Sequence, residues 1–180
     1  SNNHQGIVAT ISPIKTKNLH DLEKKIKKNK SCLILILDGI TDTKNFGAIV
    51  RSAECFGVDF IVISKSGNSP INGETIKSSS GAIFNVPICK VDHIKDAIYF
   101  LKEFGIKIIG SDDEGSKNLF KHKFEEKCAI IMGSEGDGIK KSILKLCDDK
   151  INIPLYGKLS SLNVSVATGI FLSEFKRQQS

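Results

Sequence analysis

The chain lacks several features that would assign it to a class of protein at once. It contains no tryptophan, one methionine and two tyrosines among 180 residues. Its longest uninterrupted apolar run covers residues 32–37, which is far too short to cross a bilayer. The first residues do not combine a basic segment with an apolar one, so no signal peptide is predicted. We therefore expect no membrane partner.

Cysteine and histidine are too few and too scattered for a disulfide framework or a metal site. The five cysteines are odd in number and include no Cys-x-x-Cys pair; they are Cys32, Cys55, Cys89, Cys128 and Cys147. The four histidines are dispersed as well. This pattern favours reduced core cysteines in a cytoplasmic protein, and it suggests no bound metal.

The composition is otherwise that of an ordinary globular domain with an excess of positive charge. Hydrophobic residues make up 40% and charged residues 26% of a chain without an obvious break, which indicates one domain over residues 1–180. The net charge of +6 favours an anionic partner such as nucleic acid. Leu19, Leu22 and Ile26 form a narrow helical stripe among lysines, and that lysine face is either solvated or a loose phosphate-contacting surface.

Apolar runs alternate with helical segments along most of the chain. We expect strands at 33–37, 60–63, 106–109, 128–132 and 151–153, and helices at 48–56, 93–104, 139–147 and from about residue 162 onward. Strands that are apolar throughout and separated by helices indicate an α/β fold, with a mostly parallel sheet covered by helices on both faces. Binding sites in such sheets form from loops at the carboxyl ends of strands. The polar loops expected to meet at the site are 64–70, 111–117, 133–138 and 157–161.

A glycine-rich turn, IIMGSEGDGIKKS, follows a predicted strand and invites a nucleotide-binding interpretation. Gly133 and Gly138 have the spacing of a phosphate loop, but Ile139 stands where that motif requires lysine. Glu135 and Asp137 lie inside the turn and would repel a polyphosphate. The turn is therefore either a plain glycine turn or a backbone site for a neutral or cationic ligand.

A second polar cluster follows the first predicted strand, in LDGITDTKNFGAIVRSAECFG. Asn45 lies near the start of the helix, and Arg51 follows on the helix itself among small and apolar residues. An arginine in such surroundings needs an anionic partner. That partner is either Asp38 or Asp42 in a structural ion pair, or a bound ligand.

The C-terminal stretch GKLSSLNVSVATGIF places polar side chains at the entrance of an otherwise small and apolar helix. Ser161 is a suitable helix N-cap. Capping explains one residue, however, and leaves Asn163 and Ser165 without a role.

Three segments resemble, in order, the three motifs of the SpoU/TrmH-type RNA ribose 2′-O-methyltransferases of the SPOUT class. They are LDGITDTKNFGAIVRSAECFG, IIMGSEGDGI and INIPLYGKLSSLNVSVATGIFLSE, and the resemblance runs from about residue 33 to the C-terminus. The leading HQGIVATISPIK and the ending SLNVSVATGIFLSEFKRQQS are similar to the bacterial 23S rRNA guanosine 2′-O-methyltransferase branch. Thr43 replaces a proline that often precedes the motif asparagine, a change that affects loop stiffness rather than chemistry.

The resemblance implies a fold, a cofactor and a set of site residues. The C-terminal segment would form a deep trefoil knot, and two copies would form a homodimer with the site near the interface. S-adenosylmethionine would be the methyl donor, without a metal. Backbone groups would hold the donor at Gly133, Ile153 and Leu162. The catalytic motif residues map to Asn45, Arg51, Glu135, Ser161 and Asn163.

The chemistry of these side chains indicates their roles. Ser161 and Asn163 would fix the donor loop and the incoming ribose by hydrogen bonds. Glu135 would orient its neighbours rather than act as a base. Arg51 is a general base in some family accounts, but a guanidinium keeps its proton under almost all conditions. Bidentate capture of the phosphate beside the ribose is therefore the preferred role, with phosphate-assisted proton transfer as the alternative.

The resemblance thus predicts methylation of a ribose 2′-hydroxyl in RNA, with a guanosine in 23S rRNA as the expected target. The alternatives are a tRNA target and a non-catalytic RNA-binding or assembly factor with the same fold. Members of the rRNA branch usually carry a separate N-terminal RNA-binding domain, which we expect this chain not to include. Residues 1–30 would then be an extension and one helix that precede the rest of the catalytic domain.

Overall fold

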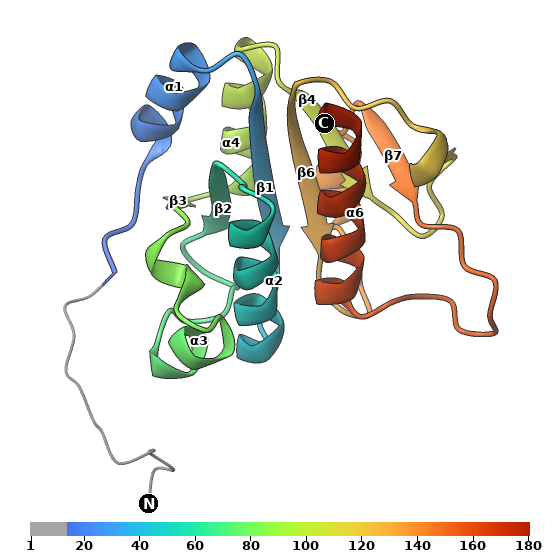
Figure 1. Cartoon of the computed structure of the whole chain (residues 1–180), viewed down its shortest axis with the longest axis horizontal. Helices are drawn as coiled ribbons and strands as arrows, with labels where there is room; N and C mark the ends of the chain where they lie inside the picture. Colours follow the sequence, from blue (N-terminus) through green and yellow to red (C-terminus); the bar gives the residue numbers. More distant parts are fainter. Residues whose placement is uncertain (1–13) are drawn as a thin grey trace, which may run out of the picture.

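The computed structural model describes residues 14–180 (Figure 1). Most of the leading segment HQGIVATISPIK and the first part of the predicted extension 1–30 lie outside the described residues. Among the residues that are described, none of the helices is long and apolar enough to cross a membrane.

A parallel sheet forms the centre of the described part of the chain, with its strands in the order β3-β2-β1-β6-β4-β7-β5 (Figure 1). The strands are β1 (Cys32–Asp38), β2 (Phe60–Ser64), β3 (Ile88–Val91), β4 (Lys107–Ser111), β5 (Lys117–Asn118), β6 (Lys127–Gly133) and β7 (Asp149–Asn152). The central strands β1 and β6 pair from Cys32 opposite Lys127 to Asp38 opposite Gly133. The predicted parallel sheet is confirmed.

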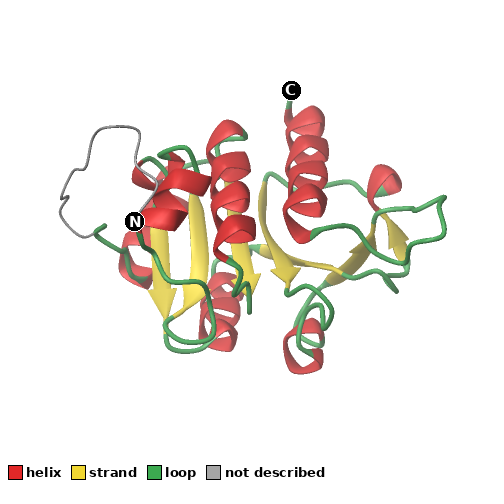
Figure 2. Cartoon of the chain, turned by 90° about the horizontal axis from the view of Figure 1, so that it is seen from below, coloured by secondary structure: helices red, strands yellow, loops and turns green. Residues whose placement is uncertain are grey.

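Helices cover both faces of this sheet (Figure 2). They are α1 (Leu19–Lys28), α2 (Thr43–Cys55), α3 (Gly73–Ser78), α4 (Ile94–Glu103), α5 (Lys141–Leu144) and α6 (Val164–Gln179), with 3₁₀ turns η1 (Ala82–Phe84) and η2 (Leu119–Lys121). Core residues of α2 and α6 pack on one face, and those of α1, α4 and α5 pack on the other. Successive side chains of a strand point to opposite faces, so Leu35 of β1 joins the first core and Ile34 the second.

Two helices begin at residues that differ from those predicted from the apolar pattern, because capping side chains determine where they start. The prediction that α2 starts at residue 48 is wrong: the helix begins at Thr43, because the Asp42 carboxylate accepts a hydrogen bond from the Asn45 backbone N–H at 2.7 Å. The N-cap of α6 is Asn163, so the prediction that Ser161 caps this helix is wrong. The helix predicted over 139–147 is also wrong in length, because α5 covers only Lys141–Leu144.

Two strands and a helix escaped the sequence pattern. Both β3 and β5 are short, and α3 is largely polar, so none of these three elements gives a long periodic hydrophobic pattern. The segment before α1 pairs with the edge strand β3, since the Lys17 backbone N–H donates to the Ile88 carbonyl at 2.7 Å and the Lys17 carbonyl accepts from the Lys90 N–H at 3.1 Å. This pairing covers part of the sheet edge.

The cysteines are free thiols in different environments. Cys32, Cys89 and Cys128 are buried, and burial raises the pKa of Cys32 to about 12 and that of Cys89 to about 11. Cys55 is exposed near the end of α2. The prediction that most of the cysteines belong to the core is confirmed by the three buried thiols, and Cys55 is the exposed exception.

Candidate active site

A cavity of about 900 Å³ lies at the carboxyl ends of β4, β6 and β7 and beside the start of α6. It is lined mainly by the segments 111–114, 132–139 and 160–164. Three of the four loops expected to meet at the site therefore contribute to it. The fourth loop, 64–70, does not line the cavity; instead the Ser69 hydroxyl donates to the Thr43 hydroxyl at 3.2 Å and supports the start of α2.

The three residues predicted to hold the methyl donor all line this cavity. They come from different parts of the chain: Gly133 ends β6, Ile153 follows β7, and Leu162 precedes α6. Glu135, Ser161 and Asn163 line the same cavity, so six of the eight predicted site residues share one space.

Asn163 joins three elements at the rim of the cavity. Its Oδ1 atom accepts hydrogen bonds from the Ser165 backbone N–H at 3.0 Å and from the Ser165 hydroxyl at 2.5 Å. Its Nδ2 group donates to Asn45 Oδ1 at 3.0 Å and to Glu135 Oε1 at 2.5 Å. The structure thus brings together three of the five predicted catalytic residues through one side-chain amide.

Close packing holds Asn45 in place. Gly47 lies two residues further along α2, and a Cβ atom there would lie 1.9 Å from the Ser78 hydroxyl of α3. That hydroxyl donates to the Thr43 carbonyl at 3.2 Å. A side chain at position 47 would push α3 away, so glycine at this position fixes the start of α2.

The turn after β6 is closed by its own backbone. Ser134 and Gly138 exchange two backbone hydrogen bonds, of 3.1 and 3.0 Å. A Cβ atom at Gly133 would lie 2.1 Å from the Gly138 carbonyl carbon, so position 133 must be glycine for the turn itself to close. This requirement fits the plain glycine turn, while the position of the turn in the cavity wall keeps the ligand interpretation open.

A buried carboxylate anchors the far end of this turn. Asp38, at the end of β1, is 2% exposed and accepts hydrogen bonds from the Lys140 backbone N–H at 2.9 Å and from its ammonium group at 3.0 Å. These bonds hold Lys140 in an extended conformation outside the helix, which accounts for the late start of α5.

Arg51 lies on the exposed side of α2. The expectation of apolar surroundings is wrong, because the helical period turns Ile49, Val50 and Ala53 toward the core and leaves Arg51 outside. Arg51 makes no ion pair with any residue in 14–180, while Asp38 binds Lys140. Of the two alternatives for the partner of Arg51, the structural ion pair with Asp38 or Asp42 is therefore wrong.

The cavity is acidic although the chain as a whole is basic. Its lining includes five carboxylates, Asp112, Asp113, Glu114, Glu135 and Asp137, and one cationic side chain, Lys141. Burial, and then the charge of Asp112, raise the pKa of Asp113 above its usual value. Both the acidic turn and the loop 111–117 were expected at the site, but the charge of Asp112, Asp113 and Glu114 did not enter that prediction. Within 14–180, no cluster of His, Cys, Asp and Glu side chains could hold a metal ion.

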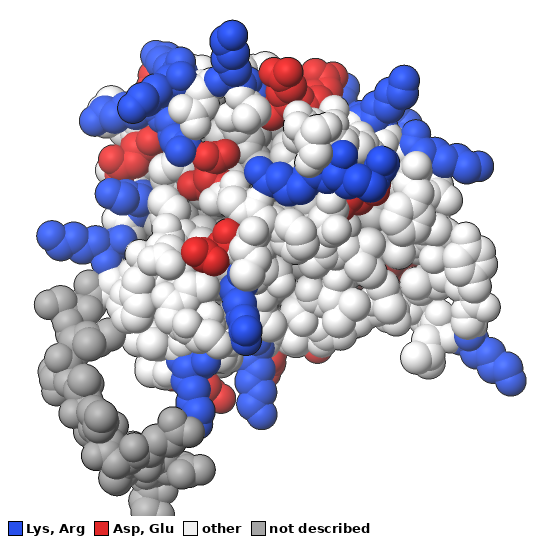
Figure 3. Space-filling model, in the orientation of Figure 1, with Lys and Arg blue, Asp and Glu red and all other residues white. Residues whose placement is uncertain are grey.

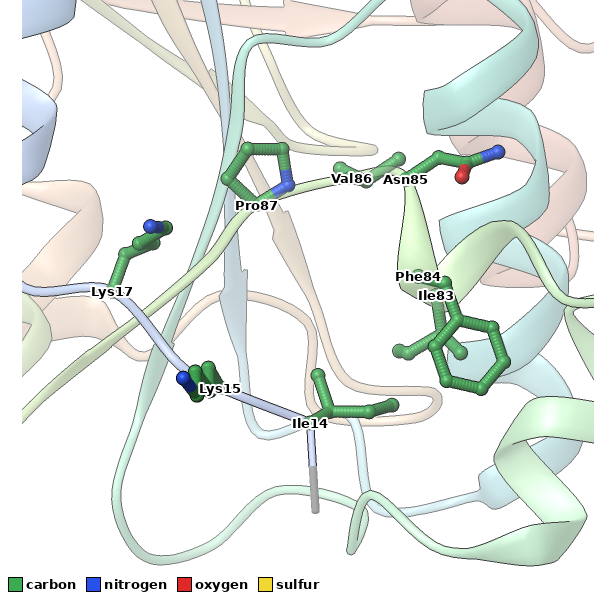
Figure 4. A pocket seen from close by; sticks show the side chains of 8 residues that line it. All are labelled: Ile14, Lys15, Lys17, Ile83, Phe84, Asn85, Val86 and Pro87. Carbon is green, nitrogen blue, oxygen red and sulfur yellow. The ribbon is translucent and has the colours of Figure 1, made fainter. Parts of the chain in front are cut away.

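A smaller hollow of about 310 Å³ lies between the segment before α1 and the turn before β3 (Figure 4). Lys15 and Lys17 approach it from one side, and Phe84 and Pro87 from the other. None of the predicted site residues lines it, so the larger cavity is the candidate active site.

The parallel α/β fold and the motif residues gathered at its cavity define an RNA methylase: the chain belongs to the SpoU rRNA Methylase family, whose model matches residues 32–173. It is 41% identical over 177 residues to the 23S rRNA (guanosine-2′-O-)-methyltransferase RlmB of Vibrio vulnificus, a match that covers 98% of this chain and 72% of that protein. The resemblance to the SpoU family is thereby confirmed.

Solved structures agree with this assignment. The AdoMet-bound rRNA methyltransferase from Sinorhizobium meliloti superposes with a TM-score of 0.83 at 25% identity, over 92% of this chain and 62% of that chain. The A. aeolicus TrmH/SpoU tRNA modifying enzyme superposes with a TM-score of 0.76 at 31% identity, over 88% of this chain and 84% of that one. This chain therefore spans less than two thirds of the S. meliloti protein and most of the A. aeolicus one.

Proposed function

We propose that this chain transfers the methyl group of S-adenosylmethionine to a ribose 2′-hydroxyl of RNA, and that the target is a guanosine of 23S rRNA. The observation that carries the reaction is the Asn163 amide, which links Glu135 and Asn45 at the rim of the cavity. The guanosine of 23S rRNA comes from the name of the V. vulnificus relative.

The cavity suits the donor in size and charge. A volume of about 900 Å³ is ample for a ligand as large as S-adenosylmethionine. The donor carries a net positive charge, which the five carboxylates of the lining attract. Backbone groups at Gly133, Ile153 and Leu162 would hold its uncharged parts. When bound, the donor supplies an electrophilic methyl group on a sulfonium centre.

The residues beside the cavity would position the ribose. The Oδ1 atom of Asn45 accepts a hydrogen bond from Asn163. The Nδ2 group of Asn45 makes no hydrogen bond within residues 14–180, so this group can donate to the ribose. Glu135 orients the Asn163 amide, and Ser161 lies in the donor loop. Holding two reactants in line lowers a reaction barrier by several kcal/mol.

Arg51 would bind the phosphate next to the ribose. It is exposed on α2, whose first turn contains Asn45, and it has no anionic partner among residues 14–180. Its planar fork suits two phosphate oxygens. The guanidinium keeps its proton, so the proton of the 2′-hydroxyl would leave by way of the phosphate rather than to Arg51.

We further infer a homodimer. The segment between β7 and α6 and the first turn of α6 expose Leu155, Tyr156, Leu159, Leu162 and Val166, with Tyr156 93% and Leu159 81% exposed. In Figure 3, the right-hand part of the face where α6 lies is largely uncharged, while charged side chains gather mainly toward its top and left. An apolar surface of this kind is typical of a contact between copies.

The deep trefoil knot and the cytoplasmic location belong to the same proposal. The knot would be formed by the C-terminal segment that carries residues 153–163 into the cavity wall. A location in the cytoplasm is supported by the free thiols and by the rRNA substrate named for the relatives.

Methyl transfer to defined RNAs tests the proposal. The chain is incubated with methyl-labelled donor and either a 23S rRNA fragment or tRNA, and the labelled nucleotide is identified after digestion, with Asn163→Ala as the matched control of reduced turnover. We expect label on the ribose of a guanosine in the 23S fragment. Selective labelling of tRNA, which the A. aeolicus relative modifies, would replace rRNA by tRNA as the substrate. Donor binding without any transfer would favour an assembly factor.

A further inference from the structure

Ser165 lies beside the active-site network, and the proposed reaction gives it no role. It is the second residue of α6 and is half-buried. Its hydroxyl donates to Asn163 Oδ1 at 2.5 Å, and its backbone N–H donates to the same oxygen at 3.0 Å. The backbone bond is the ordinary helix cap. The hydroxyl bond is additional, since capping does not require it.

The orientation of the Asn163 amide decides whether the network forms. With Oδ1 toward Ser165, the Nδ2 group points its two N–H bonds at Glu135 and Asn45. If the amide were reversed, Oδ1 would face the Glu135 carboxylate and Nδ2 would face the Ser165 N–H, so two acceptors and two donors would oppose each other. The amide therefore has one productive orientation.

The helix cap alone holds this orientation weakly. The last torsion of an asparagine side chain is broad, so a single hydrogen bond to Oδ1 leaves the amide plane free to turn. Asn163 is exposed, and water competes for its N–H groups. The Ser165 hydroxyl is a second donor to the same oxygen, and two donors on one oxygen fix the plane. A donor on the carbonyl oxygen also polarises the amide and strengthens the bonds that its N–H groups make.

We propose that Ser165 is a positioning residue of the methyl-transfer site, and that its hydroxyl holds the Asn163 amide in the orientation that presents Nδ2 to Glu135 and Asn45. This inference rests on the proposed function, because its readout is turnover. Ser165 does not line the cavity, so it would act through Asn163.

Two variants separate the hydroxyl from the cap. Ser165→Ala removes the hydroxyl and keeps the backbone N–H that caps the helix, and alanine is a good helix former. Ser165→Thr restores a hydroxyl at the same atom. We expect Ser165→Ala to lower kcat roughly two- to tenfold, the range that corresponds to one hydrogen bond. Donor affinity by calorimetry and thermal stability should stay at the wild-type level, and Ser165→Thr should regain most of the turnover.

A double-mutant cycle tests whether Ser165 acts through Asn163. In an Asn163→Ala background the amide is gone, so adding Ser165→Ala should change kcat by less than about twofold, the size of the usual additivity error. An equal loss of kcat in both backgrounds would overturn the proposal, and so would unchanged kcat in Ser165→Ala alone. If Ser165→Ala unfolds, Ser165→Thr with half or less of wild-type turnover per folded molecule also overturns it. Wild-type turnover is measured first, so its absence refutes the proposed function and not the role of Ser165.

Discussion

The cavity wall and the outer side of α2 lie on either side of Asn45 and carry opposite charge. The cavity has five carboxylates and one lysine, whereas the exposed side of α2 has two cations, Lys44 and Arg51, and one carboxylate, Glu54. Elsewhere, as the top and left of the face in Figure 3 show, charges of both signs are mixed. The segregation is thus local to the site. In the proposed function, this segregation would hold the cationic donor and the anionic RNA on separate surfaces.

Arg51 offers the strongest test of the α2 side. Arg51→Lys keeps the positive charge but loses the planar fork. We expect turnover to fall about 100-fold, as it does when one group that stabilises a transition state is removed. Donor affinity should stay unchanged, because Arg51 does not line the cavity. Arg177→Lys is the matched control, since Arg177 pairs with Glu174 at the other end of α6. Near-normal methylation by Arg51→Lys would refute the phosphate clamp.

Asp38 tests whether the cavity wall depends on its buried anchor. Asp38→Asn loses one acceptor for Lys140, and we expect a loss of about 2 kcal/mol in the free energy of unfolding together with weaker donor binding. The matched control is Asp59→Asn. Asp59 accepts from the Leu33 N–H at 3.0 Å and pairs with Lys25 at 3.0 Å, away from the cavity. Urea titrations and calorimetry of both variants should show similar destabilisation, with altered donor binding only for Asp38→Asn.

The acidic loop after β4 tests the attraction between cavity and donor. S-adenosylmethionine carries one more positive charge than the product S-adenosylhomocysteine. Asp112→Asn and Asp113→Asn should each weaken donor binding about threefold, the Coulomb effect of one charge at roughly 7 Å in water. Product binding should change less. Asp96→Asn on the exposed side of α4 is the control. Equal losses for donor and product would show that these carboxylates act by shape and not by charge.

The pH dependence of donor binding should follow the same carboxylates. Because burial and Asp112 raise the pKa of Asp113, this side chain is protonated at a higher pH than an ordinary aspartate. The attraction for the donor is full above that pKa and is lost as the pH falls through it. Calorimetry across the acidic range should show that, as the pH is lowered, donor affinity begins to fall at a higher pH in wild type than in Asp113→Asn, which lacks this titrating group. Parallel pH profiles would contradict the role of Asp113.

Cys55 provides a small, chemically controlled change on the α2 side. It lies four residues after Arg51, on the same exposed side of the helix, while burial raises the pKa of Cys32, Cys89 and Cys147. Iodoacetate should therefore modify Cys55 first and add a negative charge near the proposed phosphate. We expect the KM for RNA to rise about twofold by the Coulomb estimate. Iodoacetamide adds a neutral group of similar size, and an equal effect from both reagents would exclude a charge effect.

The sheet was predictable because its strands are apolar without alternation, and this pattern depends only on neighbouring residues. The helix starts were less predictable. Asp42 caps α2 and Asn163 caps α6, and either could equally have been a loop residue. The start of α5 was beyond the sequence pattern, since it depends on a bond from Lys140 to Asp38, 102 residues earlier.

The candidate residues of the site were predictable as a set, through their resemblance to the family motifs. The contacts between these residues were not predictable. Asn45 and Asn163 are 118 residues apart and share one hydrogen bond. Arg51 was expected among apolar neighbours, and the helical period placed it outside. The loop 111–117 was expected at the site, but its carboxylates share one cavity with the acidic turn only because β4 lies between β6 and β7.

The sequence by itself determined the α/β class, the family and the residue types available for methyl transfer, because apolar runs, helix-breaking glycines and motif spacing are local properties of the chain. Tertiary structure decided which side chains meet. The order of the strands brings three loops to one cavity, the Asn163 amide bridges two of the motifs, and Ser165 comes to lie where its hydroxyl can hold that amide. These contacts depend on distances between residues far apart in the chain, and such distances exist only once the sheet has formed.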